Sequence, residues 1–453
     1  MTTIDRISNL ATQLRGPVAR PSDAAYAGEV GGFNVAITHA PALAVGATCA
    51  EDVAAAVRFA AAAGLPVAAH ATGHGAVRAI EGGLLVNTSR MSGVRIDPVT
   101  RTATVGAGAK WQQVLTAAGW HGLGGLCGSS SDVGVVGYTL GGGLPVLGRA
   151  YGYAADRVRS LQVVTADGRL REVDAESDTE LFWALRGGTG NFGLVTSMTF
   201  DLLPLARIYG GGLFFAGEHA RAVLEAYTCW LDTVPDDLCS SLAMLRLPPV
   251  PGVPELLAGK FVMHLRVTYP GGADEGARIV SPMQACAPVL LDTIAEMPYT
   301  HLDSVHADPD HPVPFIETGC LLPALGPDLQ AQLLELGGPA SQSPLLMIEV
   351  RQLGAALDRP PAGGDAIGSR GAAFSILGIG VAAGPRADAV PAAIGALREV
   401  MAPHASGTFV NLRGAPTAHD GHHAWPADTY ARLCRAKANY DPENVFRSGH
   451  TFG

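Results

Sequence analysis

Charged residues are scarce in this chain, and the basic ones form no cluster. Asp, Glu, Lys and Arg together make up 16% of the 453 residues, and the formal net charge at pH 7 is −10. Proteins that bind nucleic acid neutralise phosphates with clustered Lys and Arg, so this composition excludes an electrostatic nucleic-acid partner. No apolar run approaches the roughly 18 residues of a membrane span, so we expect no membrane insertion.

Cysteine is sparse and unpatterned. The seven cysteines are odd in number, widely spread and never spaced as Cys-x-x-Cys, which excludes a disulfide framework and a cysteine zinc site. Residues 1–15 look like a short amphipathic helix and lack the features of a signal peptide. We therefore expect a cytoplasmic protein. His419, His422 and His423 cluster in a polar segment, but a solvated loop is the favoured interpretation, so no metal site is predicted.

Glycine, in contrast, is abundant, and two stretches place it where a backbone must come close to a ligand. The first runs from Ala69 to Ala76 and sets His74 between two glycines, and the second runs from Ser130 to Gly143. Successive backbone N–H groups can hold a pyrophosphate without basic side chains, which suits an acidic protein. The two stretches predict a site for a large phosphate-bearing cofactor.

Secondary-structure patterns change near residue 205. Before it, short strands alternate with helices, which is typical of an α+β domain. After it, longer strand candidates at residues 260–268, 345–352 and 372–381 are separated by helices. This second pattern predicts an antiparallel sheet with helices on one face.

A Gly-x-Gly-x-x-Gly sequence at residues 188–193 matches the dinucleotide-binding turn of Rossmann folds. That turn must follow a strand and open a helix. Here a helical pattern precedes the glycines and a β-branched run follows them, so the Rossmann interpretation is disfavoured.

From about residue 36 to its end, the chain resembles the FAD-linked oxidases of the berberine-bridge-enzyme-like group, in the vanillyl-alcohol-oxidase superfamily. The resemblance implies a two-domain PCMH-type FAD-binding fold of class α+β. Residues 1–205 and 406–453 would form the FAD-binding domain, and residues 206–405 an inserted antiparallel-sheet substrate domain covered by helices. It rests on the order and spacing of these segments: His70–His74, Val133–Gly137, Leu140–Gly143, Gly148–Asp156, Leu181–Gly188, Asn191–Gly193 and Tyr440–Phe446.

The resemblance also implies that FAD is bound covalently through His74, which falls on the family's flavin-linked histidine. Many relatives form a second link through a cysteine, but that position is Ser130 here and Cys127 lies three residues too early. A single link is therefore expected. The resemblance implies cofactor contacts from His70, Ala71, Thr72, Gly73, His74, Gly75, Ala76, Ser130, Asp132, Val133, Gly134, Gly137, Tyr138, Gly141, Gly142, Val195 and Asn411.

The catalytic base departs from the family pattern. Carbohydrate and polyketide-glycoside oxidases of the family carry a tyrosine-x-asparagine whose phenol helps to remove the substrate proton, but Phe409 stands before Asn411 here and cannot move a proton. Either another residue is the base or the substrates are not sugars. Glu349 is our candidate base, because a carboxylate in an apolar pocket has a raised pKa. A positioning ion pair with Arg351, on the same face of the strand, is the favoured alternative.

Two further residues have roles implied by the resemblance. Tyr138 takes the place of a histidine beside the flavin, where its hydroxyl would stabilise the reduced form, and Val133 lies near the dioxygen site, where valine accompanies oxidase behaviour. We expect hydride transfer from a small organic alcohol, amine or natural-product intermediate to FAD, with dioxygen reduced to hydrogen peroxide. The alternative is a non-redox enzyme, such as a cyclase, with a flavin scaffold. No sequence pattern indicates an oligomeric state.

Overall fold

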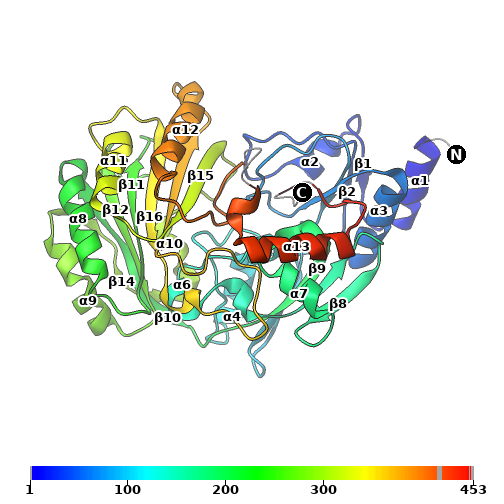
Figure 1. Cartoon of the computed structure of the whole chain (residues 1–453), viewed down its shortest axis with the longest axis horizontal. Helices are drawn as coiled ribbons and strands as arrows, with labels where there is room; N and C mark the ends of the chain where they lie inside the picture. The colour runs from blue at the N-terminus through cyan, green and yellow to red at the C-terminus, as the bar shows by residue number, and fades with distance from the viewer. Residues whose placement is uncertain (1–2, 416–420, 448, 450–453) are drawn as a thin grey trace.

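Three sheets organise the computed structural model of the chain, which describes residues 3–415, 421–447 and 449 (Figure 1). His419 therefore lies outside the described residues. The first sheet has the order β1-β2-β4-β3, the second β5-β6-β9-β7-β8, and the third, with eight strands, is formed by residues 207–381. No helix in the described ranges is long and apolar enough to cross a membrane.

The first sheet positions the His74 loop. Its strands are β1 (Val18–Ala19), β2 (Leu43–Gly46), β4 (Leu84–Asn87) and β3 (Val67–His70), the last three parallel. Helix α3 (Ala50–Ala63) buries Val53 and Val57 against this sheet and ends at Gly64, whose φ of 66° is the left-handed conformation that glycine adopts freely. The loop after β3 thus leaves the carboxyl end of a parallel strand.

The second sheet is antiparallel and holds the core of the N-terminal half. Segment 188–193 lies between helix α7 and strand β9 as a 3₁₀ turn and does not open an α-helix, which agrees with the rejection of a Rossmann turn. The elements are β5 (Val94–Asp97), β6 (Thr102–Gly106), α4 (Trp111–Gly119), α5 (Val135–Leu140), α6 (Gly148–Tyr151), β7 (Val158–Val164), β8 (Leu170–Asp174), α7 (Thr179–Leu185) and β9 (Leu194–Asp201).

The third sheet is antiparallel, and α8, α9, α11 and α12 cover its outer face (Figure 1). Alternation along β16 turns Ile348 and Val350 toward the helices and Glu349 toward the N-terminal half. The α+β class and the helix-covered antiparallel sheet are as expected. The elements are β10 (Arg207–Ala216), α8 (Ala220–Leu231), β11 (Cys239–Arg246), β12 (Phe261–Tyr269), α9 (Ala273–Ala285), β13 (Val289–Asp292), β14 (Ala295–Pro298), β15 (Phe315–Leu322), α11 (Pro327–Gly337), β16 (Leu345–Gln352), β17 (Phe374–Val381) and α12 (Val390–Met401).

The C-terminal helix α13 (Ala427–Tyr440) returns to the N-terminal half and lies beside α7 (Figure 1). Buried Lys437 fixes it there, donating hydrogen bonds to the carbonyls of Asn191 (2.8 Å) and Phe446 (2.6 Å) and to the Asp441 carboxylate (2.6 Å). The sheet of residues 207–381 is therefore an insertion between segments that pack together. Three short helices complete the fold: α1 (Thr3–Gln13), α2 (Tyr26–Val30) and α10 (Asp303–His306).

Candidate functional site

His74 is held in place by contacts on two sides. Its ring stacks on Phe33, with centroids 3.7 Å apart and planes 16° apart, and its Nδ1 lies 2.8 Å from Thr72 Oγ1. Gly73 has a φ of 75°, and a Cβ at this position would come within 2.6 Å of Gly32 Cα. The crossing of these two loops therefore requires glycine.

The His74 ring is neutral at pH 7. Burial lowers its pKa to about 4; the Asp132 carboxylate opposes this shift, and the Lys110 ammonium, which pairs with Asp132, adds to it. The Nε2 atom of His74 is buried and has no hydrogen-bond partner within the described part of the chain. A neutral imidazole with an available ring nitrogen is a competent nucleophile.

The two glycine stretches found in the sequence meet in space. A Cβ at Gly134 would lie 3.6 Å from both the Ala71 Cβ and the Thr72 Oγ1, so the second loop packs directly on the first. His70 makes a separate contact, with its Nε2 3.1 Å from the Glu29 carbonyl. At the other end of the loop, Gly75 is exposed and Ala76 partly so.

Ser130 occupies the position expected for a second tether. Its Oγ accepts a hydrogen bond from the Asp132 backbone N–H at 3.3 Å, and its side chain is partly accessible. Cys127 belongs instead to the apolar core, and burial raises the pKa of its thiol well above its usual range. A protonated core thiol is a poor nucleophile.

Asn411 brings the C-terminal segment against α5. Its Nδ2 donates a hydrogen bond to the Tyr138 carbonyl at 2.8 Å, and a Cβ at Gly141 would lie only 1.7 Å from Asn411 Oδ1. The phenol oxygen of Tyr138 is buried without a partner among the described residues, and burial raises its pKa well above the usual value. Tyr138 therefore presents a hydrogen-bond donor that lacks an acceptor.

Of the remaining predicted cofactor residues, three belong to the second glycine stretch and one to strand β9. Gly142 follows Gly141 with a φ of 107°, and Gly137 is exposed on α5. The Val133 carbonyl accepts a hydrogen bond from the Trp111 backbone N–H at 3.1 Å. Val195 is buried within strand β9, in the core of the second sheet.

Glu349 and Arg351 contact each other on one face of β16, at 3.1 Å. Glu349 also accepts hydrogen bonds from Arg266 Nη1 (2.8 Å) and Ser241 Oγ (2.7 Å). Burial alone would raise the Glu349 pKa, but the charges of Arg351 and Arg266 outweigh it and hold the pKa well below its usual range. A carboxylate engaged by three donors is a poor base, so the contacts favour the ion-pair alternative.

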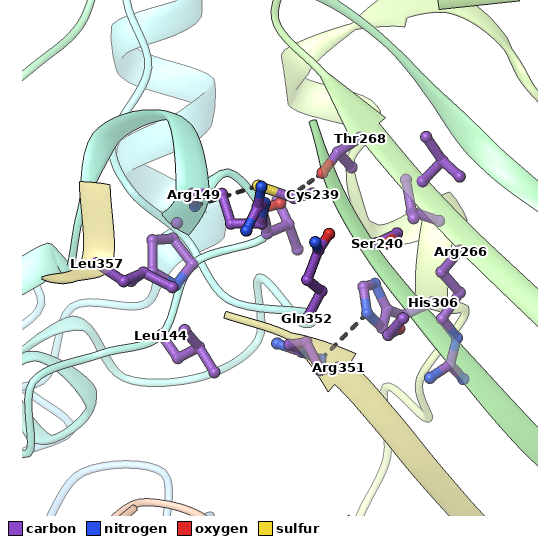
Figure 2. Close-up of a pocket in the computed structure, with 16 residues that line it drawn as sticks. Leu144, Arg149, Cys239, Ser240, Arg266, Thr268, His306, Arg351, Gln352 and Leu357 are labelled. Carbon is purple, nitrogen blue, oxygen red and sulfur yellow. Dashed lines mark hydrogen bonds between the residues drawn. The ribbon is translucent and has the colours of Figure 1, made fainter. Parts of the chain in front are cut away.

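A pocket lies beside this ion pair, between the third sheet and the segment after α5 (Figure 2). Arg351 and His306, joined by a 3.3 Å hydrogen bond, form one wall, and Leu144 and Leu357 lie across from them. Burial and the neighbouring arginines lower the pKa of His306 well below its usual value, so its ring is neutral. The Arg351 charge also lowers the pKa of the Tyr138 phenol, against the larger effect of burial.

Phe409 is no substitute for the family's tyrosine. It is buried in an apolar cluster, and its ring centroid lies 5.8 Å from that of Tyr153. Arg266 and Ser241 were missed in the sequence. The one signal that could have found Arg266 is its place within a mainly apolar strand, which marks a buried charge in need of a partner.

Comparisons with known proteins identify FAD-binding relatives of this chain. Residues 41–174 match the family described as FAD binding domain, and residues 408–451 that described as berberine and berberine like. An uncharacterized FAD-linked oxidoreductase of Bacillus subtilis, YvdP, is 27% identical over 457 residues, covering 96% of this chain and 98% of the relative. An FAD-linked oxidoreductase of Dictyostelium discoideum is 27% identical over 300 residues, covering 65% of this chain.

The matches to several relatives are partial. The chain covers 63% of the Dictyostelium protein and 34% of an FAD-dependent monooxygenase of Fusarium proliferatum, to which it is 36% identical over 174 residues. The solved structure of 6-hydroxy-D-nicotine oxidase from Arthrobacter nicotinovorans has a TM-score of 0.85 at 21% identity and covers 97% of this chain and 98% of its own. Xylooligosaccharide oxidase from Myceliophthora thermophila, in complex with xylobiose, gives 0.85 at 21%, covering 99% of each chain. The family resemblance and its fold are confirmed.

Proposed function

We propose that this chain holds FAD through one covalent bond from His74 and oxidises a small organic molecule, because it belongs to the berberine-bridge-enzyme-like group of FAD-linked oxidoreductases. The observation that carries the proposal is the neutral His74 ring, whose buried Nε2 has no partner among the described residues. Ser130 in place of a second cysteine supports a single link. When bound, FAD accepts a hydride from the substrate and passes the electrons to dioxygen, which gives hydrogen peroxide.

The residues present fit such a cofactor. Buried polar atoms without partners are rare in folded proteins, and two of those among the described residues, His74 Nε2 and the Tyr138 hydroxyl, belong to the two segments that the glycine motifs identify. The site provides a nucleophile at one end and, at the other, the Tyr138 donor and the positive charge of Arg351. A donor and a cation in a water-poor site favour negative charge on a bound group.

The proposed substrate is an alcohol, an amine or a natural-product intermediate. It binds between the N-terminal half and the open face of the third sheet, which is the face opposite helices α8, α9, α11 and α12. Leu144 and Leu357 give this pocket an apolar wall, and Phe409 belongs to the same apolar cluster. Val133 supports reaction with dioxygen. The seven free cysteines support a reducing, cytoplasmic location.

Acid precipitation tests the covalent bond. The wild-type protein should keep its yellow colour in the precipitate, His74→Ala should release its flavin, and Cys127→Ser, a change at a core thiol, should keep it. Flavin that washes out of the wild type, or stays with His74→Ala, contradicts the proposal.

A non-redox role with a flavin scaffold is the second candidate, and Phe409 in place of a proton-moving tyrosine favours it. The two candidates differ under anaerobic conditions. Substrate bleaches the flavin of an oxidase, whereas a scaffold flavin stays oxidised while product forms.

A further inference from the structure

Glu317, on β15, is a carboxylate that no role above uses. Its orientation follows from its neighbour Thr318, whose Oγ1 accepts a hydrogen bond from Arg398 Nε of α12 at 2.9 Å. Since α12 lies on the helix-covered face and side chains alternate along a strand, Glu317 points to the opposite face. That face carries Glu349 and turns toward the N-terminal half.

The sheet register gives the distance between the two carboxylates. Leu377 on β17 pairs with Glu349 on one side and with Gly319 on the other, and Gly319 lies two residues from Glu317. The two Cα atoms are offset by two strand spacings of about 4.8 Å across the sheet and by two residues of about 3.4 Å along the strands. These two offsets together give a distance of about 12 Å. Glu317 therefore lies well outside the Glu349 ion pair.

Glu317 is close to the His74 loop. Phe33, which stacks on His74, is followed by Asn34, which exchanges two hydrogen bonds of 3.2 Å with the backbone of Phe315. Phe315 is two residues before Glu317 on the same strand face, about 7 Å along the backbone.

The C-terminal segment closes the other side. A Cβ at Gly414 would lie 3.4 Å from the Glu317 Cγ, and Gly414 follows closely after Asn411, which binds α5. Glu317 thus lies where three parts of the candidate site meet: the His74 loop, the Asn411 segment and the open sheet face.

Within the described residues, the Glu317 carboxylate has no hydrogen-bond or ion-pair partner. The cations on neighbouring elements are engaged or neutral: Arg398 binds Thr318 on the opposite face, Arg413 is buried with an interaction of its own, and His74 is uncharged. On β17, the residue opposite Glu317 is apolar Ile379. Burial therefore raises the Glu317 pKa to about 7, although the side chain stays partly accessible.

We propose that Glu317 binds a protonated amine of the substrate. This inference rests on the proposed function, because the ligand is the molecule oxidised at the same site. An isolated carboxylate in apolar surroundings lacks the counter-charge that a buried ion requires, and an ammonium group supplies it together with hydrogen-bond donors. Among the substrate classes above, Glu317 selects cationic amines over neutral alcohols.

Calorimetric titration of the holoenzyme with benzylamine, and with benzyl alcohol as the neutral analogue, tests the proposal. Only the ionised carboxylate binds the cation, so the benzylamine Kd should fall about tenfold per pH unit up to pH about 7 and then level off. Benzyl alcohol should bind more weakly and without this pH dependence. Calorimetry does not depend on the flavin signal.

Two variants complete the experiment. At pH 8, Glu317→Gln should weaken benzylamine binding by about tenfold or more and abolish its pH dependence, since a charge-assisted bond is lost. Glu335→Gln, a matched change at an exposed residue of α11, should bind as the wild type does. Should Glu317→Gln fold poorly, Glu317→Asp is expected to retain the pH dependence at lower affinity.

Equal affinity for the amine and the alcohol overturns the proposal, and so does undiminished benzylamine binding by Glu317→Gln. Flavin retention after acid precipitation is scored on the same preparations. Lost flavin with intact amine selectivity contradicts the covalent-flavin proposal and leaves the Glu317 site standing.

Discussion

Replacing Glu349 by glutamine removes the carboxylate that pairs with buried Arg266 and partly buried Arg351. The side chains of Glu349 and Arg266 are only 3% and 4% exposed, so little solvent is present to compensate the remaining charges. Removing one partner of a buried ion pair typically costs 3–5 kcal/mol, because the other charge stays buried and unpaired, and we expect Glu349→Gln to destabilise the protein by about 4 kcal/mol.

Urea denaturation of the wild type and the variant measures this difference in unfolding free energy. Ser241→Ala is the matched control: it removes one neutral donor to Glu349 and should cost only about 1 kcal/mol. Combining Glu349→Gln with Arg266→Gln removes both charges, so the double variant should be more stable than the sum of the single losses predicts.

A catalytic base would behave differently. Loss of a positioned base slows flavin reduction by about 10²- to 10⁴-fold and needs no loss of stability. If the free energy of unfolding of Glu349→Gln lies within about 0.5 kcal/mol of the wild-type value, as is usual for surface substitutions, the ion-pair argument is refuted. A normal stability combined with slow anaerobic flavin reduction would restore Glu349 as the base.

Three further outcomes are expected. Glu317 has a pKa of 4.5 when unperturbed and about 7 in the folded protein, so between these pH values the folded protein keeps a proton that the unfolded chain has released. Its stabilising effect is complete below pH 4.5 and is lost as the pH rises through 7; the loss is at most about 3 kcal/mol, and thermal melts should show it in the wild type but not in Glu317→Gln. Gly141→Ala should displace Asn411 from Tyr138 and cost about 1–3 kcal/mol, with lower flavin content on purification. Because Val133 supports oxidase behaviour, the photoreduced wild type should reoxidise rapidly in air, and a reduced flavin that persists for minutes contradicts this.

The backbone of the site could be predicted because its geometry requires particular residues. Gly73 and Gly141 lie where a Cβ would clash with another chain segment, so the glycine patterns report real close approaches. Period-two alternation likewise placed Glu349 and Arg351 on one face, and the structure brings them into contact.

The partners of these charges could not be predicted. Ser241 and Arg266 reach Glu349 from β11 and β12, about a hundred residues earlier in the chain, and the sequence does not encode that register in any local pattern. Glu317 was overlooked for the same reason. Its isolation depends on Gly414 and Ile379, which only the folded sheet brings beside it.

The two ends of the open sheet face differ in charge, and this difference orients a cationic substrate. Arg266 and Arg351 together outweigh Glu349 by one positive charge, since buried His306 is neutral. An ammonium near Arg351 is repelled there, whereas Glu317 attracts it. The electrostatics of one sheet face thus direct the amine toward the His74 side and leave the Tyr138 side for negative charge.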